Sequence, residues 1–412
     1  MESVDFTIHD LLHELAERVS GSEFFRIGLN GSPVDIPRGV HHLFIETKNV
    51  AEINEIILDL GNLRTLIIND DPYEKYPEKK MKTYHDLEKF LGRLFMRLTK
   101  LWVLVIELNF YTSELSVPAS IDHMKHLRYL GFNFRDGLSG LILPSTFSKL
   151  YHTQTIDIPC FRASCPENMA NLIYLRHISA PLSFPNIGRL TSLQTMRSFL
   201  VKEAQGYELK QLMHLNKLRG SLTILGLEAV GSKEEALEAH LCNKKRLREL
   251  ELMFLWRKSF SPDVEAEVLE GLCPPKDLRE LKISFYNGSR YPSWVLSGHH
   301  PDAPKHLHKL ELYSCSQLAA IPEDSELFIG LRELSIHNCD WDRLPENMEC
   351  LVSLHSLWIC NCDKIELLPT LPHQALKTIG IEGCPVLSRT CKEEGHPNWD
   401  KIQHIPEQRF IW

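Results

Sequence analysis

The chain has 412 residues, of which 43% are hydrophobic and 24% are charged. This is the composition of a folded protein, and it argues against a disordered tail or a bundle of membrane helices. The 46 basic and 54 acidic side chains give a net charge of -8, which offers no electrostatic reason to expect a nucleic acid or an anionic membrane as the partner.

No apolar run approaches the roughly 20 residues that a membrane-spanning helix requires. The first residues, "MESVDFTIHD", match neither a secretory signal nor an organelle transit peptide. We therefore expect a cytoplasmic protein, in a reducing compartment where its 11 cysteines stay free thiols.

The first expected element is a helix over residues 7–20, whose leucines fall on one side and which ends at Gly21. It places His9 and His13 four residues apart on one face, as in the H-E-x-x-H motif of zinc proteases. The residue after His9 is Asp10 instead of glutamate, and no third ligand is indicated. An ordinary packed helix is therefore favoured over a zinc site.

One pattern then recurs along the chain: an aliphatic residue, two variable residues, a second aliphatic, one variable residue and a third aliphatic. Most copies are separated by about 20 to 29 residues, the period of a leucine-rich repeat. Four copies carry a cysteine three positions after the third aliphatic, which that repeat also favours, at Cys315, Cys339, Cys362 and Cys384. The second aliphatic marks fourteen copies, at Leu43, Leu66, Leu104, Leu130, Ile156, Ile178, Met196, Leu222, Leu250, Leu281, Leu310, Leu334, Leu357 and Ile379.

Each copy is expected to form a short strand in which the second and third aliphatic residues point inward and their neighbours point outward. One repeat cannot bury its own apolar edge, so stability must come from stacking on neighbouring repeats. We therefore expect an α/β leucine-rich-repeat solenoid over residues 30–384, shaped as a horseshoe, with a single parallel sheet on its concave face. Residues 385–412, where the repeats have stopped, are expected to cap the last strand.

Two places interrupt the regular spacing. A charged, proline-containing loop is expected over residues 69–86, followed by a helix whose apolar face runs from Leu87 to Leu94. Farther on, Ser232 and Glu235 stand in capping-box spacing, which predicts a longer helix on the convex side.

No pattern in the sequence supports catalysis. Cys360 and Cys362 are spaced C-x-C, whereas structural zinc sites use C-x2-C pairs and four ligands, and the repeat already explains Cys362. There is no G-x-S-x-G motif and no G-x-x-x-x-G-K-[ST] phosphate loop. We expect a protein that is not an enzyme and that uses no cofactor or metal ion.

The repeat register also fixes which side chains face outward on the strands of the C-terminal half. Tyr313 and Trp358 stand there among scattered charges, and aromatic residues supply much of the energy of many protein interfaces. The alternative is a solvated face with no partner. The candidate protein-binding residues are Lys282, Glu311, Tyr313, Glu333, His337 and Trp358.

Several stretches resemble one known family. "IHDLLHELAERVSG" is similar to the end of the nucleotide-binding module of plant nucleotide-binding leucine-rich-repeat disease resistance proteins, which have Met-His-Asp where this chain has Ile8, His9 and Asp10. Four more stretches resemble the coiled-coil class of that family, and with them the resemblance covers essentially the whole chain: "IGRLTSLQTM" from Ile187, "LNKLRGSLTILGLEAV" from Leu215, "KEEALEAHLCNKKRLRELEL" from Lys233 and "WDKIQHIP" from Trp399.

The resemblance implies that residues 1–29 are a remnant of the winged-helix end of the nucleotide-binding module. In the family, the matching histidine and aspartate lie beside bound nucleotide and help to hold the receptor off. Because this chain has no phosphate loop, we expect His9 and Asp10 to be only the capped start of a helix.

The resemblance also implies a role in plant defence. The repeats are then expected to bind a pathogen effector or a host protein, or to restrain the nucleotide-binding domain of a complete receptor. The alternatives are a general leucine-rich-repeat scaffold without an immune role and a non-functional, truncated receptor fragment. A hydrolase is disfavoured by the missing motifs, and an extracellular receptor by the missing L-x-G-x-I-P repeats and signal peptide.

Overall fold

The computed structural model describes residues 21–28, 36–37, 39–47, 57–70, 84–108, 112–134, 137–254, 261–288, 290–296, 304–315, 328, 330–344, 346–372 and 375–411. The expected helix over residues 7–20, with Ile8, His9 and Asp10, and most of the expected loop over residues 69–86 lie outside the described residues. The chain divides into two compact units, Met1–Phe184 (unit 1) and Pro185–Trp412 (unit 2), and each is described by itself.

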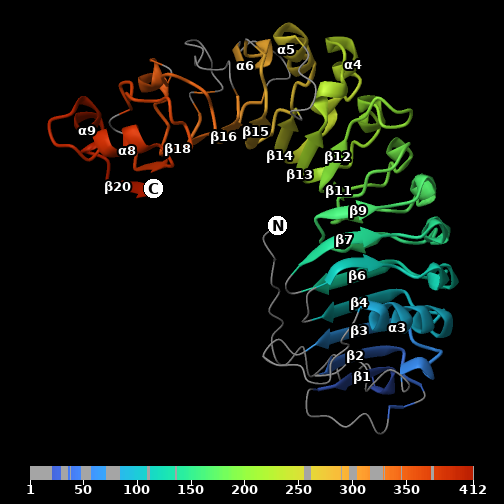
Figure 1. Cartoon of the computed structure of the whole chain (residues 1–412). Helices are drawn as coiled ribbons and strands as arrows, with labels where there is room; N and C mark the ends of the chain where they lie inside the picture. The colour runs from blue at the N-terminus through green and yellow to red at the C-terminus, as the bar shows by residue number, and fades with distance from the viewer. Residues whose placement is uncertain are drawn as a thin grey trace. The chain divides into compact units, whose positions relative to one another are not determined.

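Parallel strands of successive repeats lie side by side in unit 1, in the order β1-β2-β3-β4-β6-β8-β10 (Figure 1). A second, three-stranded parallel sheet has the order β5-β7-β9. The bounds are β1 (Phe24–Ile27), β2 (His42–Thr47), β3 (Thr65–Asp70), β4 (Val103–Leu108), β5 (Thr112–Ser116), β6 (Tyr129–Phe134), β7 (Leu138–Ile142), β8 (Thr155–Asp157), β9 (Arg162–Ser164) and β10 (His177–Ile178).

The chain returns between these strands through helical segments. The predicted helix is present as α3 (Tyr84–Arg97), and the side chains of its apolar face, such as Phe90 and Leu94, are at most 1% exposed. Three 3-10 helices follow it, and a proline with ψ between 144° and 159° precedes each of them. They are η2 (Ala119–His123), η3 (Ser145–Lys149) and η4 (Glu167–Asn171), and one short 3-10 helix, η1 (Gly21–Glu23), precedes β1.

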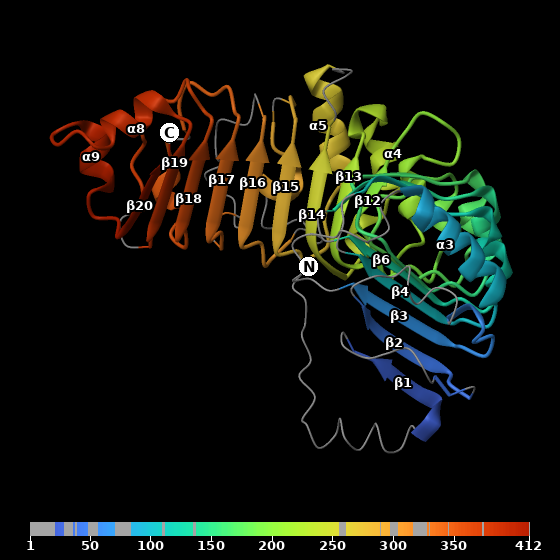
Figure 2. The ribbon, with the colours of Figure 1, turned by 60° about the horizontal axis from the view of Figure 1, so that its bottom comes forward.

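Unit 2 has its own parallel sheet, in the order β12-β13-β14-β15-β16-β17-β18-β19-β20, with its later strands drawn as a row of arrows in Figure 2. The strands of this sheet are β12 (Ser198–Leu200), β13 (Arg219–Leu225), β14 (Arg246–Met253), β15 (Glu280–Ser284), β16 (Lys309–Tyr313), β17 (Glu333–His337), β18 (Ser356–Cys360), β19 (Thr378–Glu382) and β20 (Glu407–Ile411). The short strand β11 (Thr195–Met196) precedes them and is not part of this sheet.

Short helices connect the strands of unit 2. The α-helices are α4 (Lys233–Leu237), α5 (Pro262–Gly271), α6 (Ser293–Leu296), α8 (Pro385–Thr390) and α9 (Pro397–Ile402). The 3-10 helices are η5 (Ile187–Arg189), η6 (Leu209–Leu212), η7 (Leu227–Ala229), η8 (Leu241–Asn243) and η9 (Met348–Cys350).

All fourteen marker residues of the repeat lie in parallel strands, one strand for each copy, and all are buried. Leu310 and Leu334, for example, are 3% and 2% exposed. The repeat prediction is therefore confirmed at every copy. The expected single sheet was wrong, because the strands of unit 2 from β12 onward form a separate sheet from the strands of unit 1.

The turns after the strands of unit 2 share one backbone geometry. Two residues after the third aliphatic, the backbone is left-handed in five repeats, at Phe285, Ser314, Asn338, Asn361 and Gly383. The next residue is the repeat cysteine in the last four of these, and its thiol donates to a carbonyl of the preceding repeat, as Cys362 does to Ile336 and Cys384 to Ile359. These cysteines are therefore buried structural groups that join one repeat to the next.

Two segments differ from what the sequence predicts. Ser232 does cap α4, since its hydroxyl accepts a hydrogen bond from the Glu235 N–H at 3.3 Å, but this helix is only five residues long. His240 adopts a left-handed conformation at φ 47°, which ends the helical path before η8 begins. Phe24–Ile27 pair with β2 as β1 and so join the sheet of the repeats, although the sequence assigned them to the winged-helix remnant.

Candidate interaction surface

The strands of unit 2 present three rows of outward side chains, because paired residues of parallel strands stand side by side and alternate residues share a face. From β13 to β18 the first row is Ser221, Glu249, Glu280, Lys309, Glu333 and Ser356. The second row is Thr223, Glu251, Lys282, Glu311, Ser335 and Trp358. The third row is Leu225, Met253, Ser284, Tyr313, His337 and Cys360.

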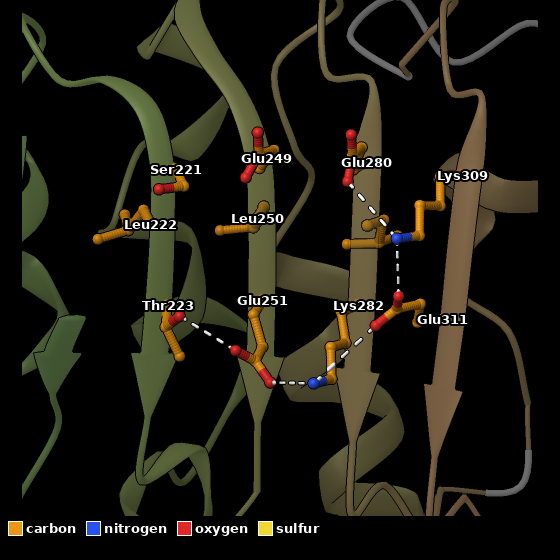
Figure 3. Close-up of a pocket in the computed structure, with 11 residues that line it drawn as sticks. Ser221, Leu222, Thr223, Glu249, Leu250, Glu251, Glu280, Lys282, Lys309 and Glu311 are labelled. Carbon is orange, nitrogen blue, oxygen red and sulfur yellow. Dashed lines mark hydrogen bonds and ion pairs between the residues drawn. The ribbon is translucent and has the colours of Figure 1, made fainter. Parts of the chain in front are cut away.

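The first two rows enclose a hollow of about 230 Å³ over β13 to β16 (Figure 3). Charged side chains that line the hollow form a continuous network of ion pairs. Lys282 Nζ lies 3.2 Å from a carboxylate oxygen of Glu251 and 3.9 Å from one of Glu311. Lys309 Nζ lies 2.9 Å from Glu311 and 4.0 Å from Glu280. Thr223 donates a hydrogen bond to Glu251 at 3.1 Å, so the network links four strands.

The charges of the network act on one another's pKa values. The hydrogen bond that Lys309 donates to the Glu311 carboxylate raises the pKa of Lys309 above its ordinary value, and the charge of Glu280 adds to this effect. Partial burial raises the pKa of Glu280, and the neighbouring carboxylate of Glu249 raises it further. Glu249 and Glu280 therefore stand side by side in the first row, and the lysines neutralise their negative charge only in part.

A second cluster surrounds Tyr313, next to the hollow. Its ring is stacked on His337 with centroids 6.3 Å apart and meets the Phe285 ring edge-on at 5.3 Å. Lys282 Nζ lies 5.7 Å from the Tyr313 ring centroid, which joins this cluster to the charged network. Partial burial lowers the pKa of His337, so the imidazole favours its neutral form.

Trp358 forms a third feature, farther along the sheet. Its indole lies over Gly380 of β19, where an added Cβ would be only 2.1 Å from Cε3 of the ring. The Nε1–H donates to Ser356 Oγ at 3.0 Å, and the Arg409 guanidinium lies 6.0 Å from the ring centroid. Because glycine has no side chain, the indole fits over Gly380, and Trp358 is half-buried there.

The structure brings most of the predicted site residues together. Lys282, Glu311, Tyr313 and His337 form one continuous group through the contacts described above, and Glu333 is exposed on the same strand as His337. Trp358 is separate from this group. It belongs to the second row, in register with Glu311 and not with Tyr313, and its indole lies over Gly380 of β19.

The hollow also involves four residues that were not chosen as candidate binding residues, although the repeat register predicts that they face outward. These are Glu249, Glu251, Glu280 and Lys309. Three small residues at outward positions are buried instead, because larger neighbours cover them. These are Ser284, Ser335 and Cys360.

Cys360, the first cysteine of the C-x-C pair, is buried in β18. Burial raises the pKa of Cys360 to about 11, which disfavours the thiolate that a metal would bind. Among the residues that the structure describes, no group of three or more His, Cys, Asp or Glu side chains could hold a metal ion. Within the same described ranges, no helix is long and apolar enough to cross a membrane.

Comparison with known proteins agrees with this architecture. Residues 209–339 match the family model described as R13L1/DRL21 LRRs. A leucine-rich-repeat protein of Leptospira interrogans has the same fold, with a TM-score of 0.52 and 17% sequence identity over 91% of this chain and 90% of that chain.

Plant proteins are among the proteins that this chain resembles in sequence. The chain is 31% identical over 153 residues to the putative disease resistance protein RGA1 of Solanum bulbocastanum, covering 37% of this chain and 15% of that protein. It is 30% identical over 307 residues to a putative disease resistance protein of Arabidopsis thaliana, covering 70% of this chain and 21% of that protein. The chain thus spans about a fifth or less of these relatives, and it is similar to the leucine-rich-repeat region of plant nucleotide-binding disease resistance proteins of the coiled-coil class.

Proposed function

We propose that the strand face of unit 2 binds a protein during plant defence and that the Tyr313 cluster and Trp358 are its main anchors. The partner is a pathogen effector or a host protein, or the nucleotide-binding domain of a complete receptor that the repeats restrain. The protein acts in the cytoplasm by binding and does not catalyse a reaction.

The observation that carries this proposal is the fixed position of two half-buried aromatic side chains on a mostly polar face. Tyr313 is held between Phe285 and His337, and Trp358 is held over Gly380. A side chain that is already ordered loses little conformational entropy on binding, and tyrosine and tryptophan dominate the energetics of many interfaces. A purely solvated face needs no such arrangement.

The similarity to disease resistance proteins favours the immune role over a general scaffold. A scaffold would bind the same partners in healthy and infected tissue. An immune sensor of an effector would instead gain a partner on infection.

The test is a pull-down from healthy and infected leaf extracts with the wild-type chain and the double variant Tyr313→Ala, Trp358→Ala. Truncation of a buried interface aromatic commonly costs about 2 kcal/mol or more, about 30-fold in affinity. We therefore expect the double variant to lose the partner while its melting temperature stays nearly unchanged, since the core leucines are untouched.

The matched control is Tyr151→Ala, which removes a tyrosine that is 52% exposed in unit 1. It should keep the partner. Normal binding by the double variant would mean that recognition lies elsewhere, and identical partners in both extracts would favour the scaffold.

A further inference from the structure

We propose that the hollow over β13 to β16 accepts a basic side chain of the bound protein, an arginine or a lysine, between Glu249 and Glu280. This inference rests on the proposed function, since it states which chemistry the strand face recognises. The Tyr313 cluster and the hollow then form adjacent parts of one surface, joined by Lys282.

The charges that line the hollow do not balance. Four carboxylates and two ammonium groups line it, which leaves two negative charges: Glu249, Glu251, Glu280 and Glu311 against Lys282 and Lys309. Lys282 lies between Glu251 and Glu311, and Lys309 lies closer to Glu311 than to Glu280. The uncompensated negative charge is therefore at the Glu249 and Glu280 side of the hollow.

Glu249 has no ion-pair partner in the described part of the chain, and it stands in register beside Glu280 on the next strand (Figure 3). Like charges at facing positions of neighbouring strands are destabilising. The adjacent Arg248 does not relieve them, because its guanidinium donates to the backbone carbonyls of Lys245 and Leu247. A partner cation between the two carboxylates would remove this repulsion.

The size of the hollow and its residue types narrow the choice of cation. Its volume of about 230 Å³ is below the roughly 300 to 1,000 Å³ of typical small-molecule sites, so it suits one side chain better than a cofactor. The described residues hold no cluster of ligands for a metal ion, which disfavours an inorganic cation. A guanidinium is planar and carries five donors, so it can bind both carboxylates at once.

The experiment is a selection of random twelve-residue peptides displayed on phage against the immobilised chain. Three baits are compared: the wild type, the charge-reversed variant Glu249→Lys, Glu280→Lys, and the variant Tyr313→Ala, Trp358→Ala. The wild type should enrich peptides rich in arginine or lysine. The charge-reversed bait should lose this preference and favour aspartate or glutamate.

A selected basic peptide is then synthesised and its Kd is measured by calorimetry. Glu249→Gln with Glu280→Gln should weaken binding by about tenfold or more, because each carboxylate loses a charge-assisted hydrogen bond. Glu394→Gln, an exposed glutamate outside the strand face, should leave the Kd unchanged. The melting temperature of Glu249→Gln should not fall, since the change removes a repulsion.

Three results would overturn the inference. If the selected peptides have no excess of arginine or lysine but still need Tyr313 and Trp358 for binding, the basic occupant is refuted and the proposed function stands. A Kd that the Gln variants do not change would place the cation elsewhere. No peptide enriched over a blank support would contradict both the inference and the proposed function.

Discussion

Lys244 is the most unusual charged residue that the structure describes. Its side chain is completely buried, and Nζ donates a hydrogen bond to the Leu212 carbonyl oxygen at 2.7 Å. Burial lowers the pKa of this ammonium group from 10.5 to about 8. The folded state therefore gives up the proton of Lys244 at a lower pH than the unfolded chain does.

This difference predicts a pH dependence of stability. Between about pH 8 and 10.5 the unfolded chain binds one more proton than the folded chain at this site, so the contribution of Lys244 to the free energy of unfolding increases with pH. Relative to Lys244→Met, the wild type should gain up to about 3 kcal/mol between pH 7 and 10, measured by chemical denaturation. The exposed neighbour provides the control, because Lys245→Met should show no such trend. A difference that is constant across this range would contradict the lowered pKa.

The sequence revealed which residues face outward on the candidate surface but not how their side chains lie. The position of Trp358 depends on Gly380, which belongs to the next repeat and leaves space for the ring. The burial of Ser335 depends on its small size between Glu311 and Trp358 on the neighbouring strands. Both facts involve pairs of repeats, so a pattern read one repeat at a time could not show them.

At the scale of elements, the main strands were predictable because the aliphatic spacing sets both their register and their buried face. The strands without this spacing were not predictable. In β9 the first and third residues are exposed and the middle one is half-buried, and in β20 four of the five residues are exposed. Neither strand therefore has a buried apolar face that its sequence could reveal. Their positions follow from pairing with neighbouring strands, which is a tertiary effect. The helix α5 had a usable signal, since Ser261 caps it and Pro262 follows at its first position.

Asn398 is the central residue of the segment after the last repeat. It is completely buried in α9, where its Oδ1 accepts from the Leu368 N–H and its Nδ2 donates to the Glu366 carbonyl and the Thr390 hydroxyl, each at 2.8 Å. It therefore ties α8 and α9 to the loop after β18. The parallel pairing of β20 with β19 completes this end of the sheet.

The variant Asn398→Leu should detach this end. It leaves buried backbone groups without partners, which costs about 1 to 3 kcal/mol for each group. We expect a lower melting temperature and faster hydrogen exchange over residues 385–411, with little change in β13 to β15. Equal exchange in Asn398→Leu and the wild type would show that the end is held by packing alone.

At the scale of the whole molecule, each repeat is stabilised mainly by the repeats beside it. The pairing of unit 2 runs from strand to strand in sequence order, and the buried leucines of one strand face those of the next. In such an array the free energy of unfolding is approximately a sum of repeat and interface contributions. Damage to one repeat should therefore spread first to its two neighbours.

The variant Leu310→Ala tests this expectation in the middle of the sheet. Leu310 is 3% exposed in β16, between Leu281 of β15 and Leu334 of β17, and Leu→Ala in a core costs about 2 to 5 kcal/mol. Hydrogen exchange followed by mass spectrometry should accelerate most in β15, β16 and β17, and less in β19 and β20, which lie three and four strands away from β16 in the sheet. The control is Glu333→Ala, which truncates an exposed residue of the neighbouring strand β17 and should leave exchange in β15, β16 and β17 unchanged. Uniform acceleration from β12 to β20 would instead mean that unit 2 unfolds as one cooperative body, in which distant repeats support one another as strongly as adjacent ones.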